Sequence, residues 1–486
     1  MSLRDLWRRR GDAENDGGGL PVDLGPDQTH PIDLLWVDEL VAGFRPFVVV
    51  RPEDELLILV PNRPWKMNAT ALRVLSAMLD EGVGIAEVLR REGDSPRKRR
   101  ELHHFFADLQ DLLRGQLGEG TGRRAVVHEP FDPAFCRYPV LSELALTYRC
   151  NLSCRFCYAG CRAEGLPAGW DEDRRLDLDG MKRALDIIRR DARCPSVSLT
   201  GGEPTLAPEL PEVVAHGKSL GMHVNLISNG LRLGAALVDR LASAGLDSAQ
   251  LSLEGPDAAT HDTLVGRPGA FDRLWGALDR LRVADIRVHT NTTISRGNLA
   301  AMGAIVDGVA DRGLDRLTMN LVIPCGAASG EPEAMVPYAE IGPSLLAAQE
   351  RAEARGVRFI WYSPLPLCLI NTAAEGLGSP GCAAADGLLH VNPAGDVLPC
   401  SSFCHDETLG NLLAESFDEL WQSATARFFR DKRMLPGPCE GCDQAHICQG
   451  ACTLYWREVG TAELVGGSAD DRPPAPAGWF SASGDD

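Results

Sequence analysis

The sequence predicts an α/β fold, a partial (β/α)6 barrel with a smaller domain on either side of it in the chain. Short aliphatic strands alternate with amphipathic helices over residues 141–335, which is typical of a parallel sheet or barrel. Six strand–helix units are two fewer than a closed eight-stranded barrel has, so we expect an open barrel. After about residue 365 this periodicity fades and cysteines become frequent, which predicts an irregular cysteine-rich domain over 365–460.

The barrel elements are read from hydrophobic periodicity. The expected strands cover 144–148, 197–200, 224–228, 249–253, 288–294 and 317–322. The expected helices cover 181–190, 209–220, 235–244, 271–283, 299–312 and 343–355. All six strands would end at the same edge, where parallel barrels place their chemistry.

The segment 44–120 is expected to form a winged-helix-like α+β domain. Its strands cover 47–50 and 56–60, Asn68 caps its first helix, and two more helices cover 85–91 and 97–114. Residues 1–40 and 461–486 are rich in Gly, Asp and other polar residues, and we expect a loose N-terminal and a flexible C-terminal tail.

Composition excludes several classes of protein. The chain has 486 residues, which predicts two to four domains, and its 44% hydrophobic content excludes wholesale disorder. The 49 Lys and Arg against 68 Asp and Glu leave a formal charge of −19, which disfavours binding to nucleic acid or to an anionic membrane surface. No apolar run approaches the ~20 residues that a bilayer crossing needs. We therefore expect neither a nucleic-acid nor a membrane partner.

The 15 cysteines are clustered, and residues 1–19 lack the apolar core of a secretory signal. We expect a cytoplasmic protein, whose clustered thiols are metal ligands or catalysts and not disulfides. Cys136, Cys194 and Cys325 stand apart from the clusters and are expected to be small buried hydrophobes. Of these three, Cys325 follows the sixth strand and is the one positioned to face a pocket.

The first cluster is Cys150-x3-Cys154-x2-Cys157, directly after the first barrel strand. Three thiolates in one short loop can hold three irons of a cubane and leave the fourth iron open. An open coordination position distinguishes a catalytic metal site from a sealed one. The alternative is a structural zinc loop in which Cys161 supplies the fourth ligand.

A glycine-rich segment, Thr200-Gly201-Gly202-Glu203-Pro204, follows the second strand. Paired glycines allow a ligand to approach the backbone closely, and this position is at the carboxyl edge of the barrel. By itself this segment is weak evidence for a ligand site. Because it comes one strand after the cysteine triad, the two motifs together are strong evidence.

The CxxxCxxC triad, with Phe156 before its last cysteine, and the GGEP segment together resemble the radical S-adenosylmethionine (SAM) superfamily over residues 141–335. The resemblance implies a partial TIM barrel and a [4Fe–4S] cluster on Cys150, Cys154 and Cys157. SAM would chelate the open iron through its amino and carboxylate groups, with Gly201, Gly202, Glu203 and Pro204 at the amino end.

Four polar residues at later strand ends match the family's ribose-side positions more loosely: Ser228, Asn229, Ser252 and Glu254. Many relatives carry Asp where this chain has Glu254. The alternative is that these residues satisfy loop amides. The acid or base of the reaction is not identified by the sequence, and Glu254, His261 and Tyr362 are unranked candidates.

Six cysteines near the C-terminus have a second regular spacing, Cys382-x12-Gly395-x4-Cys400 and Cys439-x2-Cys442-x5-Cys448-x3-Cys452. Six thiols exceed the four that one site uses, so we expect two auxiliary metal sites, with a pair of zinc ribbons as the alternative. The pattern resembles the SPASM extension of radical SAM maturases, which implies two auxiliary iron–sulfur clusters.

The chain departs from the SPASM pattern because no cysteine follows Cys452. The resemblance implies that Cys382, Cys400 and Cys452 hold one cluster, and that Cys439, Cys442 and Cys448 hold the other. We expect Cys368 to complete the first cluster and Cys404 the second. An open iron or an oxygen ligand is the alternative.

The N-terminal domain resembles the RiPP recognition element, which is related to the pyrroloquinoline quinone peptide chaperone. The resemblance implies β-augmentation, in which an extended leader peptide adds a strand to an exposed sheet edge. The alternative is a DNA-binding winged helix that uses the basic run 97–100. The acidic chain and the balanced charge of this domain favour a peptide.

These resemblances imply a radical SAM/SPASM maturase. Such an enzyme cleaves SAM reductively to a 5′-deoxyadenosyl radical, which abstracts hydrogen from a ribosomal precursor peptide. The electrons would come from an external flavodoxin- or ferredoxin-type donor. One alternative is a radical SAM enzyme of heme- or quinone-type cofactor biosynthesis. Another, of a different class, is a non-catalytic iron–sulfur or zinc protein that acts as a scaffold or electron carrier.

Overall fold

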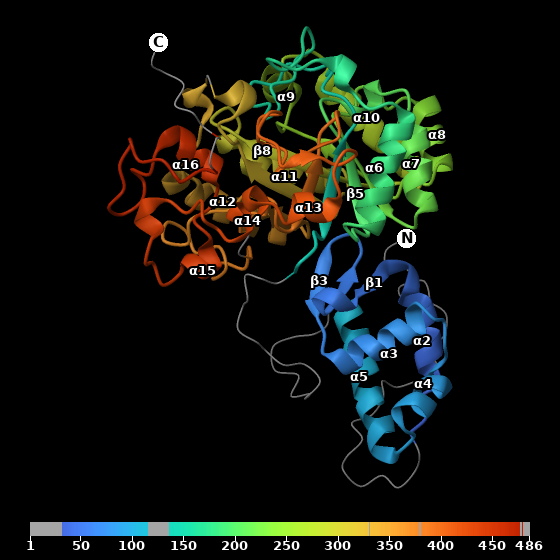
Figure 1. Cartoon of the computed structure of the whole chain (residues 1–486). Helices are drawn as coiled ribbons and strands as arrows, with labels where there is room; N and C mark the ends of the chain where they lie inside the picture. Colours follow the sequence, from blue (N-terminus) through green and yellow to red (C-terminus); the bar gives the residue numbers. More distant parts are fainter. Residues whose placement is uncertain (1–31, 115–135, 330, 379–380, 477–478, 480–486) are drawn as a thin grey trace. The chain divides into compact units, whose positions relative to one another are not determined.

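The computed structural model describes residues 32–114, 136–329, 331–378, 381–476 and 479. The chain divides into two compact units, Met1–Phe135 and Cys136–Asp486, which are described separately (Figure 1). No helix in the described part of the chain is both long and apolar enough to cross a bilayer.

The first unit contains more regular structure than the sequence predicts. Its elements are α2 (Trp36–Phe44), β1 (Val48–Arg51), β2 (Leu56–Leu59), β3 (Arg63–Lys66), α3 (Ala69–Leu79), α4 (Ile85–Glu92) and α5 (Pro96–Arg114). The expected tail over 1–40 is wrong from Trp36 onward because α2 buries Val37, Leu40 and Val41 in the core of the unit. Residues 1–31 lie outside the described residues.

Local sequence accounts for the helices of this unit. The side chain of Asn68 caps α3 as expected, and its oxygen accepts a hydrogen bond from the Ala71 N–H at 2.8 Å. Apolar residues at helical spacing on α3 and α5, among them Leu75 and Phe106, pack into one buried core. The third strand, β3, was missed because its sequence, Arg-Pro-Trp-Lys, lacks an aliphatic alternation and is mostly exposed.

The three strands form an antiparallel sheet in the order β1-β2-β3, so β3 is an edge strand. The Met67 N–H donates to the Glu55 carbonyl at 2.8 Å. Alternate residues of an antiparallel pair turn their N–H and C=O groups toward the partner strand, so the backbone groups of Trp65 face β2 and those of Pro64 and Lys66 face the opposite side. Proline is tolerated there because its missing N–H faces outward.

The second unit is built on one sheet of ten strands in the order β10-β9-β8-β7-β6-β5-β4-β11-β12-β13. The strands are β4 (Leu141–Ala145), β5 (Ser196–Thr200), β6 (His223–Ser228), β7 (Ser248–Ser252), β8 (Arg287–Ile294), β9 (Arg316–Leu321), β10 (Arg358–Trp361), β11 (Leu388–Val391), β12 (Asp396–Leu398) and β13 (Gly410–Asn411). Strands β4 to β10 run parallel in register. The predicted partial barrel is confirmed, with β10 as one more parallel strand than the sequence indicated.

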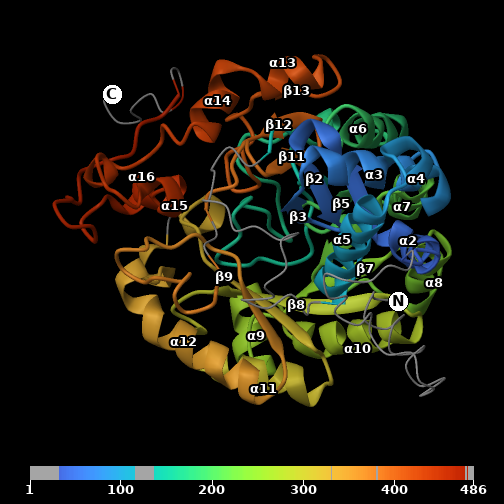
Figure 2. The same cartoon turned by 90° about the horizontal axis from the view of Figure 1, so that it is seen from below.

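The barrel helices cover the outer face of this sheet as an arc (Figure 2). They are α6 (Leu178–Arg190), α7 (Leu210–Ser219), α8 (Ala235–Ser243), α9 (Ala258–Val265), α10 (Ala270–Val283), α11 (Met302–Asp311) and α12 (Tyr338–Ala354). All six expected helices are present within a few residues. Helix α9 was not predicted, because its eight residues have a weak amphipathic pattern.

The cysteine-rich region is less irregular than expected. β11 pairs in parallel with β4, and β12 and β13 continue the same sheet, so this region extends the barrel sheet. Short helices follow: α13 (Phe417–Trp421), α14 (Ala424–Arg430), α15 (Ala445–Cys448) and α16 (Thr453–Val459). The first part of the expected flexible tail is also packed, since Thr461 and Leu464 are buried.

Candidate functional site

Three cysteines lie in the loop that follows β4, at the carboxyl edge of the barrel. Cys154 is within electrostatic reach of Cys157 and Cys150, and all three residues are half-buried. Burial raises the pKa of the Cys150 thiol to about 12 and that of Cys154 well above its usual range. Buried thiolates need cationic partners, and three soft sulfur donors in one loop fit an iron–sulfur cluster.

No three His, Cys, Asp or Glu side chains converge closely enough for one metal ion within the described ranges. Tetrahedral zinc with Zn–S bonds of ~2.3 Å would bring its sulfurs to within about 3.8 Å of one another. A cubane spreads its ligands over separate irons and so tolerates wider spacing.

Cys161, the proposed zinc ligand of the alternative reading, lies in an apolar environment beside the triad. It is 1% exposed and packs with Tyr148 and Trp170. Its thiol donates to the Ala159 carbonyl at 3.9 Å, and its interaction with the Cys157 thiol lowers the pKa of Cys157 to about 7 and raises that of Cys161. Cys161 thus acts on the sulfur of a neighbouring cysteine.

The C-terminal end of α9 holds the cysteine loop. The Ser153 N–H donates to the Val265 carbonyl at 3.0 Å, and the Arg155 N–H donates to the Leu264 carbonyl at 3.4 Å. Gly266 ends α9 with φ 67°, and a Cβ there would lie 3.0 Å from the Ser153 carbonyl oxygen. The helix that the sequence analysis missed is therefore one support of the triad.

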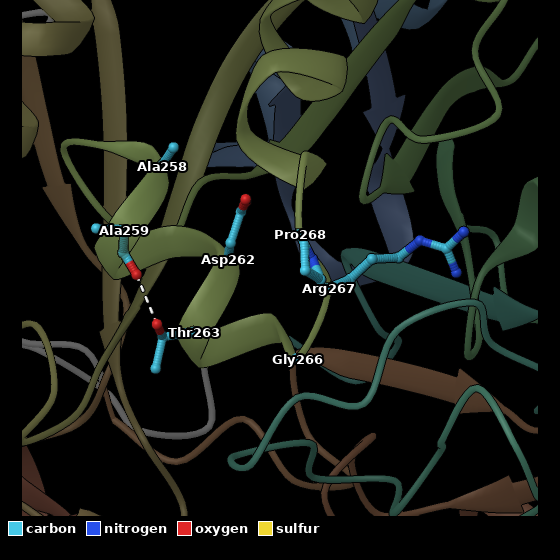
Figure 3. A pocket seen from close by; sticks show the side chains of 7 residues that line it. All are labelled: Ala258, Ala259, Asp262, Thr263, Gly266, Arg267 and Pro268. Atoms are coloured by element: carbon cyan, nitrogen blue, oxygen red, sulfur yellow. Dashed lines mark hydrogen bonds between the residues drawn. The ribbon is translucent and has the colours of Figure 1, made fainter.

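A surface pocket of about 400 Å³ opens beside α9 (Figure 3). It is lined by Ala258, Ala259, Asp262, Thr263, Gly266, Arg267 and Pro268. The Asp262 carboxylate accepts two backbone N–H groups, and the Thr263 hydroxyl donates to the Ala259 carbonyl at 2.6 Å. The Arg267 side chain extends away from the pocket and donates to the Asn151 carbonyl at 3.2 Å. These polar groups brace α9 and the cysteine loop.

The loop after β9 supports the triad from a second direction. The Ala327 N–H donates to the Cys157 carbonyl at 2.9 Å. Gly326 has φ 58°, and a Cβ there would lie 2.3 Å from the Tyr158 carbonyl oxygen and 2.5 Å from that of Cys157. Only glycine permits this contact between two backbones.

The paired glycines accommodate the chain itself, which corrects the expectation that they make room for a ligand. A Cβ on Gly201, at φ 138°, would lie 2.2 Å from the Thr147 carbonyl oxygen, and one on Gly202 would lie 2.4 Å from that of Arg149. The Gly202 N–H donates to Thr147 at 2.8 Å and the Glu203 N–H to Arg149 at 2.9 Å. The glycines thus fix the backbone that leads into Cys150. Pro204 is buried and begins the short turn Pro204–Leu206.

The Glu203 carboxylate joins three strand ends into one network. One oxygen accepts from the Thr205 N–H and hydroxyl and from the Ser228 hydroxyl, and the other accepts from the Asn229 N–H at 2.9 Å. Asn229 in turn donates through Nδ2 to Asn151 Oδ1 at 2.8 Å, in the cysteine loop. Burial raises the pKa of Glu203. The structure thus brings Glu203, Ser228 and Asn229 together beside the triad.

Glu254 and His261 interact with backbone groups. Glu254, just after β7, is buried, and its carboxylate accepts the Thr293 N–H at 2.8 Å. Its own N–H donates to His261 Nδ1 at 3.0 Å. Burial raises the pKa of Glu254 to about 8 and lowers that of His261 to about 4, so both are neutral near pH 7. These contacts agree with the alternative that strand-end polar groups satisfy loop amides.

Three other predicted residues lie apart from this network. Ser252 is half-buried at the end of β7, and Phe156 packs at the margin of the barrel core. Tyr362 is 44% exposed, and its hydroxyl accepts a hydrogen bond at 3.1 Å from Arg316, the first residue of β9. The Tyr362 ring therefore points toward the amino end of β9, away from the strand ends that carry the cysteines.

The three cysteines predicted for the first auxiliary group lie near one another, together with Cys325. The Cys400 thiol is within electrostatic reach of Cys382, Cys452 and Cys325. Cys325 is buried, and its thiol contacts Ser402. Burial raises the pKa of Cys452 to about 12.

The second auxiliary group differs from expectation in its fourth cysteine. The Cys439 thiol is within electrostatic reach of Cys448, Cys368 and Cys442. Cys368 thus lies with the second group, although the sequence analysis assigned it to the first. Cys404, which was assigned to the second, lies among Glu407, Arg457 and Asp406 instead.

The two remaining cysteines differ in burial. Cys194 is fully buried in the barrel core, as expected, and its thiol donates to the Pro139 carbonyl at 3.4 Å. Cys136 is only half-buried.

The fold and the two cysteine systems define a radical SAM enzyme with an auxiliary-cluster domain. A family model of the Radical SAM superfamily matches residues 144–300, and one of SPASM, an iron–sulfur cluster-binding domain, matches residues 382–443. The chain thus contains a radical SAM domain and a SPASM domain. It binds a [4Fe–4S] cluster and SAM in the first domain and auxiliary iron–sulfur clusters in the second. The non-catalytic and zinc alternatives are thereby set aside.

The chain is similar to curated relatives with different reactions. It is 28% identical to the AdoMet-dependent heme synthase of Methanosarcina barkeri over 67% of this chain and 95% of that protein. It is 29% identical to the PqqA peptide cyclase of Streptomyces rochei over 66% of this chain and 86% of that protein.

Solved structures share the fold. Streptococcus suis SuiB, in a crystal structure bound to precursor peptide SuiA, matches with a TM-score of 0.61 and 15% identity, over 84% of this chain and 95% of that one. Native anSMEcpe with bound AdoMet matches with a TM-score of 0.51 and 18% identity, over 65% of this chain and 90% of that one.

Proposed function

We propose that this enzyme modifies a ribosomally made precursor peptide and binds the leader of that peptide on its first unit. The extent of one structural match carries the proposal. The second unit is 351 of the 486 residues, so a match to SuiB over 84% of the chain reaches into the first unit. SuiB was crystallised with precursor peptide SuiA. The fold that the two chains share therefore includes part of this chain's first unit and the matching part of an enzyme that binds a peptide.

The outer edge of β3, opposite β2, is the surface that suits a leader. The backbone groups of Pro64 and Lys66 face this edge. Val48 and Val50 face the opposite edge, on β1, and are buried, whereas β3 is largely exposed and Trp65 is 37% exposed. An extended peptide would add a fourth strand on β3, with main-chain hydrogen bonds for affinity and Trp65 as an apolar contact.

In the second unit, we propose that Cys150, Cys154 and Cys157 hold the active-site cluster. When bound, the cluster and SAM supply one-electron reductive cleavage to a 5′-deoxyadenosyl radical, with electrons from a flavodoxin- or ferredoxin-type donor. Glu203 and Asn229 position the cysteine loop through their hydrogen bonds. The loop after β9 covers the triad at Cys157 and limits access of water.

The likeness to AdoMet-dependent heme synthase favours a second candidate, a radical SAM enzyme that acts on a small cofactor precursor. That relative matches over 95% of its own length but over only 67% of this chain. About a third of this chain therefore has no counterpart in it. We prefer the peptide because the match to SuiB extends into the first unit.

The experiment uses synthetic peptides encoded by short reading frames beside this gene, incubated anaerobically with reconstituted enzyme, SAM and dithionite. We expect 5′-deoxyadenosine and a mass change in one peptide, and we expect Cys154→Ala to abolish both. Turnover of a heme-type precursor, with no peptide modified, would favour the second candidate.

The β3 edge is tested with two variants at one position. Lys66→Pro removes the outward N–H, and Lys66→Ala keeps it while removing the ammonium that donates to the Asp54 carbonyl at 2.8 Å. Loss of one main-chain hydrogen bond costs about 1–3 kcal/mol, or roughly 5- to 150-fold in peptide affinity. Equal affinities for both variants, with formation of 5′-deoxyadenosine intact, would exclude this edge and leave the radical chemistry untouched.

A further inference from the structure

The second auxiliary group presents three thiols from one short segment. Cys439, Cys442 and Cys448 lie within residues 437–448, in a turn and the short helix α15. A [4Fe–4S] cluster that is fully ligated by protein needs four thiolates. No cysteine follows Cys452 in the sequence, so the fourth ligand has to come from elsewhere in the fold.

Cys368 is brought to this group from a distant part of the chain. It lies in the connection between β10 and β11, in a turn where the Leu369 and Ile370 N–H groups both donate to the Pro366 carbonyl. Leu365, at the start of this turn, is 2% exposed and anchors it in the barrel core. The position of the turn is therefore fixed by packing.

Two independent contacts join this turn to the second group. The Leu367 N–H donates to the Cys448 sulfur at 3.3 Å, a type of bond that tunes cluster potentials. The neighbouring Cys368 thiol is within electrostatic reach of Cys448 and Cys442, and Cys439 is within reach of Cys368. The Leu367–Cys448 bond and these neighbours place Cys368 beside the other three thiols.

The competing cysteine is placed elsewhere. Cys404 has its N–H on the Glu407 carboxylate at 2.9 Å, and Glu407 is paired with Arg457 at 2.6 Å. The pKa of the Cys404 thiol is raised by burial and by Glu407, and no cysteine contributes to that shift. The Cys404 thiol does contribute to the raised pKa of Cys325. Cys404 therefore lies on the side of the first auxiliary group.

We propose that Cys368 is the fourth ligand of the second auxiliary cluster, together with Cys439, Cys442 and Cys448. The cluster then has no open iron, and it serves to pass electrons and does not bind substrate. The inference concerns cluster ligation only and does not depend on the peptide proposed above.

Exposure makes the proposal testable in the unaltered enzyme. Cys368 and Cys404 are both exposed, so as free thiols both would alkylate readily. Anaerobic iodoacetamide labelling with mass spectrometry is compared between the cluster-loaded enzyme and the same enzyme stripped with a chelator. We expect loading to slow labelling of Cys368 at least tenfold and to change that of Cys404 less than twofold. Equal labelling rates of Cys368 in the loaded and the stripped enzyme would overturn the assignment.

A variant gives a second readout. In Cys368→Ala the second auxiliary cluster has three thiolates, so mild oxidation should release its unligated iron and roughly double the three-iron EPR signal that the open active-site cluster already gives. Loss of about four iron per chain would support the proposal equally. Cys136→Ala is the matched control, and we expect it to retain the iron content and EPR signal of the wild type. An unchanged Cys368→Ala would contradict the proposal.

Discussion

Replacing Glu203 by glutamine tests whether one buried carboxylate holds the barrel mouth together. One carboxylate oxygen accepts three hydrogen bonds, from the Thr205 N–H and hydroxyl and from the Ser228 hydroxyl, and the other accepts the Asn229 N–H at 2.9 Å. A glutamine amide has one oxygen and one NH2 group. Whichever way it turns, its NH2 group faces at least one donor, and the side chain loses its charge.

The magnitude follows from these contacts. Loss of a charge-assisted hydrogen bond together with a buried unpaired donor costs about 2–4 kcal/mol, even though a neutral amide is less costly to bury than a carboxylate. An unfolding entropy of ~2.1 cal/mol/K per residue gives about 0.7 kcal/mol/K for the 351 residues of the second unit. We therefore expect the Tm of this unit to fall by about 3–5 °C.

Anaerobic differential scanning calorimetry at one fixed scan rate measures the shift. Glu209→Gln is the matched control, because Glu209 lies six residues later and forms an ion pair with Arg175 at 2.9 Å. A partly exposed pair contributes at most about 1 kcal/mol, so the control should melt within ~1–2 °C of the wild type. Equal shifts for the two variants would refute the argument that Glu203 joins the strand ends.

Three further predictions concern other supports of the site. Gly326→Ala should reduce iron loading of the active-site cluster several-fold, because the added Cβ would lie 2.3 Å from a backbone oxygen. Gly303→Ala in α11 is the control: its Cβ would have no atom within 4 Å, so iron loading should be unchanged. Equal iron contents in the two variants would contradict this prediction. Burial lowers the pKa of His261 to about 4, so the stability of the folded protein should fall as the pH drops from about 6.5 toward 4. His261→Asn keeps a hydrogen-bond acceptor and should flatten the dependence of Tm on pH. An unchanged slope would exclude His261 as the cause. Tyr362→Phe should form 5′-deoxyadenosine within twofold of the wild type, because its hydroxyl points toward the amino end of β9, and a tenfold loss would show that it serves the site.

Local chemistry in the sequence was enough to place the centre of the site. The spacing of Cys150, Cys154 and Cys157 puts three thiols in one short loop whatever the rest of the chain does, and strand–helix alternation places that loop at the carboxyl edge of a parallel sheet. Glu203 and Asn229 were found for the same reason, because each directly follows a strand of that sheet.

The paired glycines show where local reasoning fell short. Gly201 and Gly202 were correctly singled out, but the groups they approach are carbonyls of residues 147–149, on the neighbouring strand connection. A tight contact between two backbones is invisible in either segment alone. The same holds for Gly326, which is required only because the loop after β9 crosses the cysteine loop.

Sequence by itself thus determined the class of fold, the active-site triad and the existence of a second thiol-rich region, since each rests on periodicity or on spacing within a short segment. Tertiary structure alone decided that Cys368 joins Cys439 and Cys448, that Cys325 joins the other group, and that α9 supports the triad. These pairings join segments tens of residues or more apart, and packing of the barrel core, not any local propensity, sets which of them meet.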